Sequence, residues 1–197
     1  CKGGDLFHYF IKKKFQFSEQ QIVTYIHNIS KAVYSMHNLG IIHLDLKLSN
    51  IAMISEEDEN EIRILDFGLS KIIGPGETCN ESYGTPGYAA PEVINEEDYR
   101  FKVDVWSIGA IAYFMCSSKL PFDYIGRGSN EKNILVNTIN DELTFDEPCW
   151  KKYSKEAIDF IKSTMNKDPN KRLNIKQVLE HEWIKKYFYK EVEKRKD

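Results

Sequence analysis

Apolar residues recur at helical spacing in the first quarter of the chain and in its centre. Ser18 followed by Gln21 is the pattern of a capping box, and Gly40 is a residue type that commonly ends helices. Between them the apolar positions are Ile22, Ile26, Ile29, Val33 and Met36. The stretch 103–116 is apolar on nearly every side, which predicts a helix buried all round.

Two further amphipathic stretches lie toward the carboxyl end. Residues 154–165 and 174–183 each repeat apolar positions every three or four residues. Asn174 and Gln177 form a second cap pair. Each stretch is predicted to form one helix that packs its apolar face on a common core.

Short β-rich runs separate the first helix from the rest. They cover residues 40–43, 51–54 and 62–65, and they suit small hairpins packed against the helix. With 197 residues, 42% of them hydrophobic, the chain can build one sizeable core. The expected fold class is therefore α+β, mainly α, with short β-hairpins.

Charge and cysteine content exclude several classes of protein. The formal net charge is −3, and the basic runs 12–14 and 185–186 are each followed by aromatics, so solvated helix faces are favoured over a nucleic-acid partner. The cysteines Cys1, Cys79, Cys116 and Cys149 form no CxxC pair. That pattern argues against zinc and disulfides and suits the cytoplasm, with the nucleus as the alternative. No apolar run approaches the ~20 residues of a membrane span.

Residues that could carry chemistry are concentrated in 43–50, His-Leu-Asp-Leu-Lys-Leu-Ser-Asn. Phosphoryl transfer needs held magnesium, a carboxylate for the attacking hydroxyl, and positive charge near the transferred group. Asp45 could accept the hydroxyl proton, Lys47 could face the same phosphate, and Asn50 could reach a metal. Asp66, at the end of an apolar run, offers a hard carboxylate for magnesium.

The order of the motifs is more specific than any one of them. Asp-Phe-Gly at 66–68 or an Asp/Lys/Asn loop alone would be weak evidence, since such a loop is more often a capped turn. Here Gly-Thr-Pro-Gly-Tyr at 84–88 and Ala-Pro-Glu at 90–92 follow in sequence. With these motifs the chain resembles, over nearly its whole length, the large C-terminal lobe of the eukaryotic Ser/Thr protein kinases.

The resemblance implies a protein-kinase-like fold, ATP and Mg²⁺ as cofactors, and proteins bearing Ser or Thr as substrates. It implies catalytic roles for Asp45, Lys47 and Thr85, nucleotide contacts at Asp5, Asn50, Ala52 and Asp66, and magnesium ligation by Asn50 and Asp66. Thr85 is expected to hydrogen-bond both Asp45 and Lys47 and so to orient the acceptor hydroxyl. Lys47 and Thr85 favour Ser/Thr over Tyr substrates.

The resemblance also implies three structural contacts. Asp104 is expected to brace the backbone of the catalytic loop from the start of the buried helix. Arg172 is expected to pair with Glu92, the Glu of Ala-Pro-Glu, and a buried pair of this kind is expensive to break. His43 is expected to pack against Phe67 as a structural residue.

Some family features are not among the 197 residues. There is no glycine-rich phosphate loop, no Val-Ala-Ile-Lys lysine and no helix with its Glu partner. We therefore expect residues 1–189 to be the C-terminal lobe, with the N-terminal lobe absent, and to be inactive alone. The charged tail 190–197 could begin a regulatory segment.

The catalytic loop departs from the family pattern at three positions. Leu44 replaces an Arg that pairs with an activation-segment phosphate in other members, so Thr78 and Ser82 are not expected to be obligatory phosphosites. Leu48 replaces Pro, and Ser49 stands where many arginine-directed members have Glu. Strong selectivity for several upstream arginines is therefore not expected.

Within the family the chain is most similar to the calcium/calmodulin-dependent group. Gly-Gly-Asp-Leu-Phe at 3–7, Asp-Phe-Gly-Leu-Ser at 66–70 and His-Glu-Trp-Ile at 181–184 are typical of that group, and calcium-dependent protein kinases are the closest subgroup. His-Leu-Asp at 43–45 instead resembles myosin-light-chain and death-associated kinases. The chain has no EF-hand loop, so calmodulin or a calcium-sensing domain, as part of calcium signalling, would lie outside it. The alternative function is a pseudokinase or scaffold lobe that binds partners through the loop 120–130 and neighbouring helices.

Overall fold

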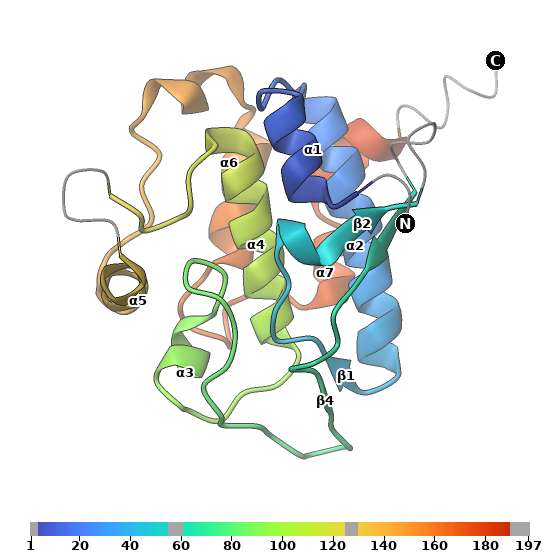
Figure 1. Cartoon of the computed structure of the whole chain (residues 1–197), viewed down its shortest axis with the longest axis vertical. Coiled ribbons are helices and arrows are strands. Elements are labelled where there is room, and N and C mark those ends of the chain that lie inside the picture. The colour runs from blue at the N-terminus through green and yellow to red at the C-terminus, as the bar shows by residue number, and fades with distance from the viewer. Residues whose placement is uncertain (1–3, 55–60, 125–129, 190–197) are drawn as a thin grey trace.

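The computed structural model describes residues 4–54, 61–124 and 130–189 (Figure 1). At its centre α2 (Glu19–Asn38) packs against α4 (Lys102–Ser117). The predicted capping box is confirmed, because the Ser18 hydroxyl accepts from the Gln21 N–H at 3.2 Å and the Gln21 amide oxygen accepts from the Ser18 N–H at 3.0 Å. Gly40 follows α2 with φ +76°, and a Cβ there would lie 2.8 Å from the Ile73 carbonyl oxygen.

Helix α4 is buried on all sides, as predicted for 103–116. Gly109 lets another helix approach it closely, since a Cβ at this position would lie 2.5 Å from the Thr164 hydroxyl and 2.6 Å from Met165 Cγ. Thr164 ends α6 (Lys155–Thr164), whose cap residue Ser154 accepts from the Ala157 N–H. The predicted helix over 154–165 is thus confirmed to within a residue at each end.

The stretch 174–183 forms two short helices, so the prediction of one helix is wrong. The Asn174–Gln177 cap is present, but α7 (Ile175–Leu179) ends early and α8 (Glu182–Ile184) starts after a new cap at His181. The break turns the Trp183 ring into the core, where its Nε1 donates to the Glu19 carboxylate at 2.7 Å.

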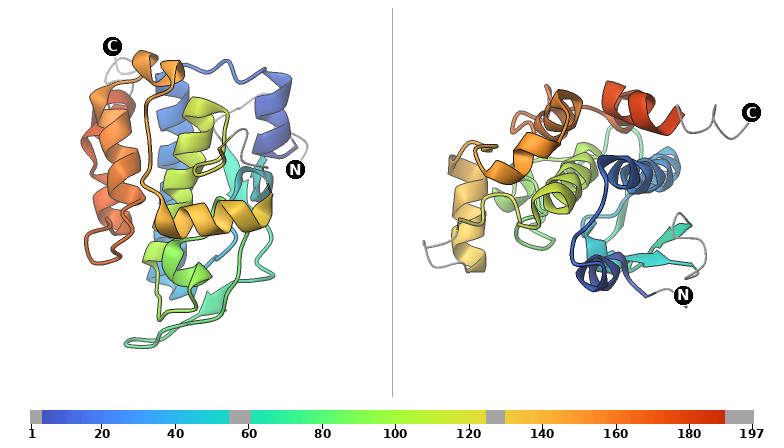
Figure 2. Two further views of the ribbon diagram at one scale, coloured as in Figure 1. Left: turned by 90° about the vertical axis from the view of Figure 1, so that its left-hand side faces the viewer. Right: turned by 90° about the horizontal axis from the view of Figure 1, so that it is seen from above.

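The elements form three layers, which are seen edge-on in Figure 2. One layer holds α6, α7 and α8, the middle layer holds α2 and α4, and the third holds α1 (Leu6–Lys12) with the short strands. Buried side chains from all three layers join one hydrophobic core. The mainly helical α+β class is confirmed.

Three of the four short strands, β1, β2 and β3, fall where β-rich runs predict them, but the pairing is only partly as expected. β2 (Ile51–Met53) and β3 (Ile62–Ile64) form an antiparallel hairpin, with Ile51 opposite Ile64. β1 (Ile41–Ile42) pairs instead with β4 (Lys71–Ile72), a strand that the sequence pattern does not reveal. Between β1 and β2 lies η1 (Leu48–Asn50), the short turn that closes the candidate catalytic loop.

Several elements have no sequence prediction behind them. These are α3 (Pro91–Ile94), α5 (Glu131–Asn140), η2 (Pro148–Lys152) and η3 (Lys185–Tyr189). The residues 55–60, the tail 190–197 and part of the predicted partner loop 120–130 lie outside the described residues.

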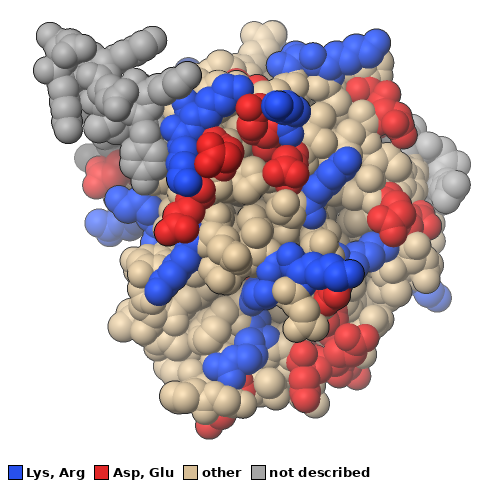
Figure 3. All heavy atoms as spheres, turned by 180° about the vertical axis from the view of Figure 1, so that it is seen from behind, with Lys and Arg blue, Asp and Glu red and all other residues tan. Residues whose placement is uncertain are grey.

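None of the helices in the described ranges is long and apolar enough to span a bilayer. On the face shown in Figure 3, Lys and Arg are interspersed with Asp and Glu.

Candidate active site

The loop 43–50 is anchored to the buried helix α4 through one carboxylate. Asp104, which is fully buried in the first turn of α4, accepts hydrogen bonds from the backbone N–H groups of His43 at 2.9 Å and Leu44 at 3.1 Å. The His37 ring Nε2 lies 2.9 Å from the same carboxylate. The expected brace is therefore present, and it ties the loop backbone to the buried helix α4.

Three predicted catalytic side chains meet directly. The Thr85 hydroxyl donates to Asp45 Oδ1 at 2.6 Å and accepts from Lys47 Nζ at 2.7 Å. Lys47 Nζ also lies 2.8 Å from Asp45 Oδ2. Asn50 adds two bonds, because its Nδ2 donates to Asp45 Oδ2 at 3.0 Å and to the Asp45 carbonyl oxygen at 2.9 Å. We refer to Asp45, Lys47, Asn50 and Thr85 as the Asp45 cluster.

The Asp45 cluster holds its central carboxylate in one orientation. Asp45 is only 8% exposed, and hydrogen bonds that involve a charged group strengthen where water is excluded. Oδ2 accepts from both Lys47 and Asn50, whereas among the described residues Oδ1 accepts from Thr85 alone. Since each carboxylate oxygen can accept about two hydrogen bonds, Oδ1 keeps an open acceptor position.

His43 has a structural position beneath this cluster. Its Nδ1 accepts from the Asp45 N–H at 3.3 Å, so Nε2 carries the proton and donates to the Leu65 carbonyl at 3.0 Å. The ring is fully buried, and its centroid lies 5.1 Å from that of Phe67. The expected packing of His43 on Phe67 is confirmed.

Asn50 and Asp66 supply oxygen atoms of the kind that magnesium binds. Because both hydrogen bonds of the Asn50 amide run from Nδ2, its Oδ1 is left as an acceptor. Asp66 is exposed with φ +59°, and Oδ1 accepts from the Gly68 N–H at 3.2 Å. The Leu65 N–H donates to the Asn50 carbonyl at 2.8 Å, which ties the two segments together.

These two residues do not complete a metal site by themselves. In the part of the chain that the structure describes, no group of three or more His, Cys, Asp or Glu could hold a metal ion. Magnesium commonly takes one or two protein oxygens and completes its octahedral shell with water and phosphate oxygens. An amide oxygen and an exposed carboxylate on tied segments therefore fit a nucleotide-bound magnesium.

The two remaining predicted nucleotide contacts lie side by side. Asp5 and Ala52 form an isolated antiparallel bridge, with Ala52 buried at the start of the β2–β3 hairpin. Asp5 caps α1, because its carboxylate accepts from the His8 N–H at 2.9 Å and meets the His8 ring at 2.6 Å. Burial pushes the pKa of Asp5 up, but the bonds from His8 outweigh it and hold that pKa below its ordinary value. A ribose hydroxyl would share this carboxylate with His8.

The segment that carries Thr85 ends at a buried ion pair. Arg172 binds Glu92 in a bidentate fashion, with NH1–Oε1 at 2.6 Å and NH2–Oε2 at 2.9 Å, so the expected pair is present.

Leu44 is buried with φ +68°, and its carbonyl oxygen would lie 2.8 Å from a Cβ at Gly84. An apolar side chain thus occupies the loop position beside Asp45.

Sequence reasoning does not identify two contacts that position the site. His37 reads as a surface or satisfied residue, yet it binds the Asp104 carboxylate. The Ser107 hydroxyl donates to the Tyr88 carbonyl at 2.9 Å and ties the Thr85 segment to α4. No spacing signal marks these residues, because their partners are distant in sequence.

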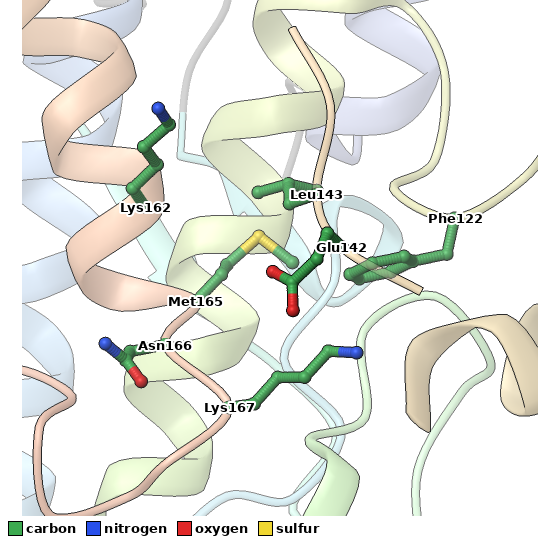
Figure 4. Close-up of a pocket in the computed structure, with 7 residues that line it drawn as sticks. All are labelled: Phe122, Glu142, Leu143, Lys162, Met165, Asn166 and Lys167. Carbon is green, nitrogen blue, oxygen red and sulfur yellow. The ribbon is translucent and has the colours of Figure 1, made fainter. Parts of the chain in front are cut away.

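A pocket of about 360 Å³ lies apart from these residues (Figure 4). It is lined by Phe122, Glu142, Leu143, Lys162, Met165, Asn166 and Lys167, none of which belongs to the Asp45 cluster. Lys167 Nζ already donates to the Ile139 carbonyl at 2.9 Å. The Lys162 ammonium points away from the Glu142 carboxylate in Figure 4, so these charges do not converge on a common ligand position.

The chain is similar in sequence to several known proteins over most of its length. The chain is 36% identical over 184 residues to "Myosin light chain kinase, smooth muscle" of Gallus gallus, and 36% identical over 185 residues to "CDPK-related kinase 5" of Arabidopsis thaliana. It is also 36% identical over 182 residues to "Titin homolog" of Caenorhabditis elegans. These matches cover 93%, 94% and 92% of this chain, but only 9%, 30% and 1% of the relatives' own lengths.

The profile of one protein family, described as "Protein kinase domain", matches residues 1–184. That range contains the Asp45 cluster, Asp66 and the Glu92–Arg172 pair. The chain belongs to the protein kinase domain family.

Proposed function

We propose that this chain is the substrate- and magnesium-binding lobe of a Ser/Thr protein kinase, which transfers the γ-phosphate of ATP to protein Ser and Thr hydroxyls. One observation carries the proposal: the Thr85 hydroxyl bridges the Asp45 carboxylate and the Lys47 ammonium at 2.6 and 2.7 Å. A base, a cation and an orienting hydroxyl thus meet at one point.

The proposed mechanism uses the open acceptor position on Asp45. A substrate hydroxyl that donates to Oδ1 is oriented toward the γ-phosphate of ATP. Its oxygen bonds to the γ-phosphorus while the bond from that phosphorus to the β–γ bridging oxygen breaks, so ADP leaves and Asp45 accepts the hydroxyl proton. Lys47 Nζ lies 2.8 Å from the same carboxylate, so its ammonium would stand beside the acceptor hydroxyl. From there it would offset negative charge on the transferred phosphoryl group. Asn50 and Asp66 would hold magnesium, which when bound supplies charge neutralisation at the phosphates.

Substrate class follows from Thr85 and Lys47 in this proposal. Thr85 places its segment against Asp45, so an acceptor on a short side chain can reach Oδ1. Ser and Thr present such short hydroxyls, whereas a Tyr hydroxyl lies at the end of a long ring. Similarity to kinases named for myosin light chain and for CDPK supports a calcium/calmodulin-related subgroup, whose regulator would lie outside this chain.

The cellular setting is part of the same proposal. Cys79, Cys116 and Cys149 are free in the described structure, which suits a reducing compartment such as the cytoplasm. The 197 residues hold no glycine-rich loop and no lysine strand to clamp ATP. We therefore expect these 197 residues by themselves not to turn over, and phosphate transfer is to be measured on the natural protein.

The test is γ-phosphate transfer from ATP to Ser, Thr and Tyr peptides by the natural protein and by its Asp45→Asn variant. Loss of a general base lowers kcat by about 10²- to 10⁴-fold, so Asp45→Asn is expected to fall in that range. Asp146→Asn makes the same chemical change at an exposed position and is expected to leave kcat unchanged. Equal turnover by Asp45→Asn would contradict the mechanism. No transfer by the natural protein would favour the scaffold alternative.

A further inference from the structure

The segment between β4 and Thr85 is held at its base by residues 99–100. The backbones of Cys79 and Tyr99 exchange two hydrogen bonds, at 3.0 and 2.7 Å. The Tyr99 hydroxyl donates to the Glu81 carbonyl at 2.9 Å, and Tyr99 itself is only 3% exposed. Arg100 donates to the Gly74 carbonyl at 3.2 Å. These contacts fix the backbone of the segment but use none of its charged side chains.

One ion pair joins the tip of this segment to the sheet beside the catalytic loop. Lys71 on β4 donates through Nζ to Glu81 Oε1 at 2.9 Å, and its ammonium also lies 5.2 Å from the Tyr83 ring centroid. The hydrogen bond with Glu81 raises the pKa of Lys71, and the same bond lowers the pKa of Glu81. Both groups therefore keep their charges over a wider pH range than isolated side chains.

The position of Glu81 relates this pair to the Asp45 cluster. Glu81 precedes Thr85 by four residues, and β4 pairs with β1, the strand that leads into Asp45. The Lys71–Glu81 pair thus links the strand pair that leads into Asp45 with the segment that leads into Thr85. Leu44, in contrast, contributes an apolar buried side chain from the loop, so it offers no charge to a modified residue on the segment.

We propose that Lys71 and Glu81 are positioning residues that form a built-in charge clamp, which holds Thr85 against Asp45 without phosphorylation of the segment. This proposal rests on the proposed kinase function. The clamp does permanently, with a carboxylate, what an added phosphate does reversibly in a segment that needs modification. Activity would then be set by other parts of the protein.

Exposure of the pair sets the size and the salt dependence of the expected effect. The Lys71 and Glu81 side chains are 34% and 44% exposed, and exposed pairs of this kind stabilise weakly and are screened by salt. Loss of the clamp is therefore expected to lower kcat/KM by about two- to five-fold at low ionic strength. The difference from the natural protein should shrink as salt is added.

The experiment compares Glu81→Gln, Lys71→Met and the charge-swapped Lys71→Glu/Glu81→Lys variant in the natural protein. The chain offers a matched control in Lys119 and Glu147, which also meet at 2.8 Å with side chains 36% and 48% exposed. Two readouts are taken at low and high salt: kcat and KM with a Ser peptide, and hydrogen exchange of the amides from 79 to 88.

Each single variant is expected to lower kcat, leave KM for ATP unchanged, and speed exchange about two- to five-fold at low salt. The swapped variant should recover most of both readouts, and Lys119→Met or Glu147→Gln should change neither. Unchanged exchange in both single variants, or a swapped variant as impaired as the singles, would overturn the clamp. Should the natural protein transfer no phosphate, the kinase proposal fails, and the exchange data still decide the clamp.

Discussion

The buried pair between Glu92 and Arg172 allows the most quantitative prediction of stability. Both residues are at most 3% exposed, and the two hydrogen bonds between them measure 2.6 and 2.9 Å. Arg172 also donates to the carbonyls of Asn166 at 2.9 Å and Lys102 at 3.1 Å, and its guanidinium lies 5.1 Å from the Trp106 ring. Each of the three guanidinium nitrogens thus has a partner, and the Glu92 carboxylate supplies the counter-charge.

The change Glu92→Gln keeps the shape of the side chain and removes that counter-charge. Breaking a buried pair by removal of one partner costs about 3–5 kcal/mol, because the remaining charge stays buried without compensation. For a chain of this length about 1 kcal/mol corresponds to about 2–4 °C in Tm. The expected fall in Tm is therefore about 6–20 °C, a large part of the stability of an ordinary domain.

The assay is urea and thermal unfolding of the 197-residue chain, followed by circular dichroism. Glu147→Gln removes the carboxylate of an exposed Lys–Glu pair and should shift the free energy of unfolding by less than about 1 kcal/mol. Arg172→Met combined with Glu92→Leu should cost less than the two single changes added together, since no charge is stranded. A loss below about 1 kcal/mol in Glu92→Gln would refute the reasoning.

Two further predictions concern the segment before the Ala-Pro-Glu motif. Thr78 and Ser82 are both exposed, and their replacement by Ala is expected to leave kcat of the natural protein within about two-fold. The reason is that Leu44 offers no charge to pair with a phosphate at either site. A collapse of kcat in the double variant would contradict this. Thr85→Ala is expected to lower kcat about 10- to 100-fold, since a hydrogen bond to a charged group contributes about 1.5–3 kcal/mol. Thr85→Ser keeps the hydroxyl and should retain most of kcat; an equal loss in both variants would show that the methyl group matters instead.

Local patterns predict the parts of the fold that depend on local physics. The Ser18 capping box and the buried helix 103–116 are confirmed, because cap residues and hydrophobic periodicity act within a few residues. The break before α8 escapes prediction, since the partner of Trp183 beyond the break is Glu19, which is 164 residues away. The pairing of β1 with β4 escapes for a different reason, because two-residue strands carry too short a pattern.

The candidate site shows the same division. Residue types and motif order name the four members of the Asp45 cluster, and the structure brings them within hydrogen-bond distance. Their catalytic and magnesium-binding roles stay predictions. The supports behind them are tertiary: His37 reaches Asp104 across 67 residues, and Lys71 reaches Glu81 across a loop. Side-chain contacts of this kind carry no periodic signal, so only coordinates reveal them.

The chemical step itself provides the most direct test of the central claim. In a single-turnover experiment, the natural protein is mixed with ATP, magnesium and a Ser peptide, and phosphopeptide formation is followed by rapid quench. We predict that Asp45→Asn slows this step by about 100-fold or more while ATP affinity changes little. An Asp45→Asn rate equal to that of the natural protein would contradict the assignment of Asp45 as the base.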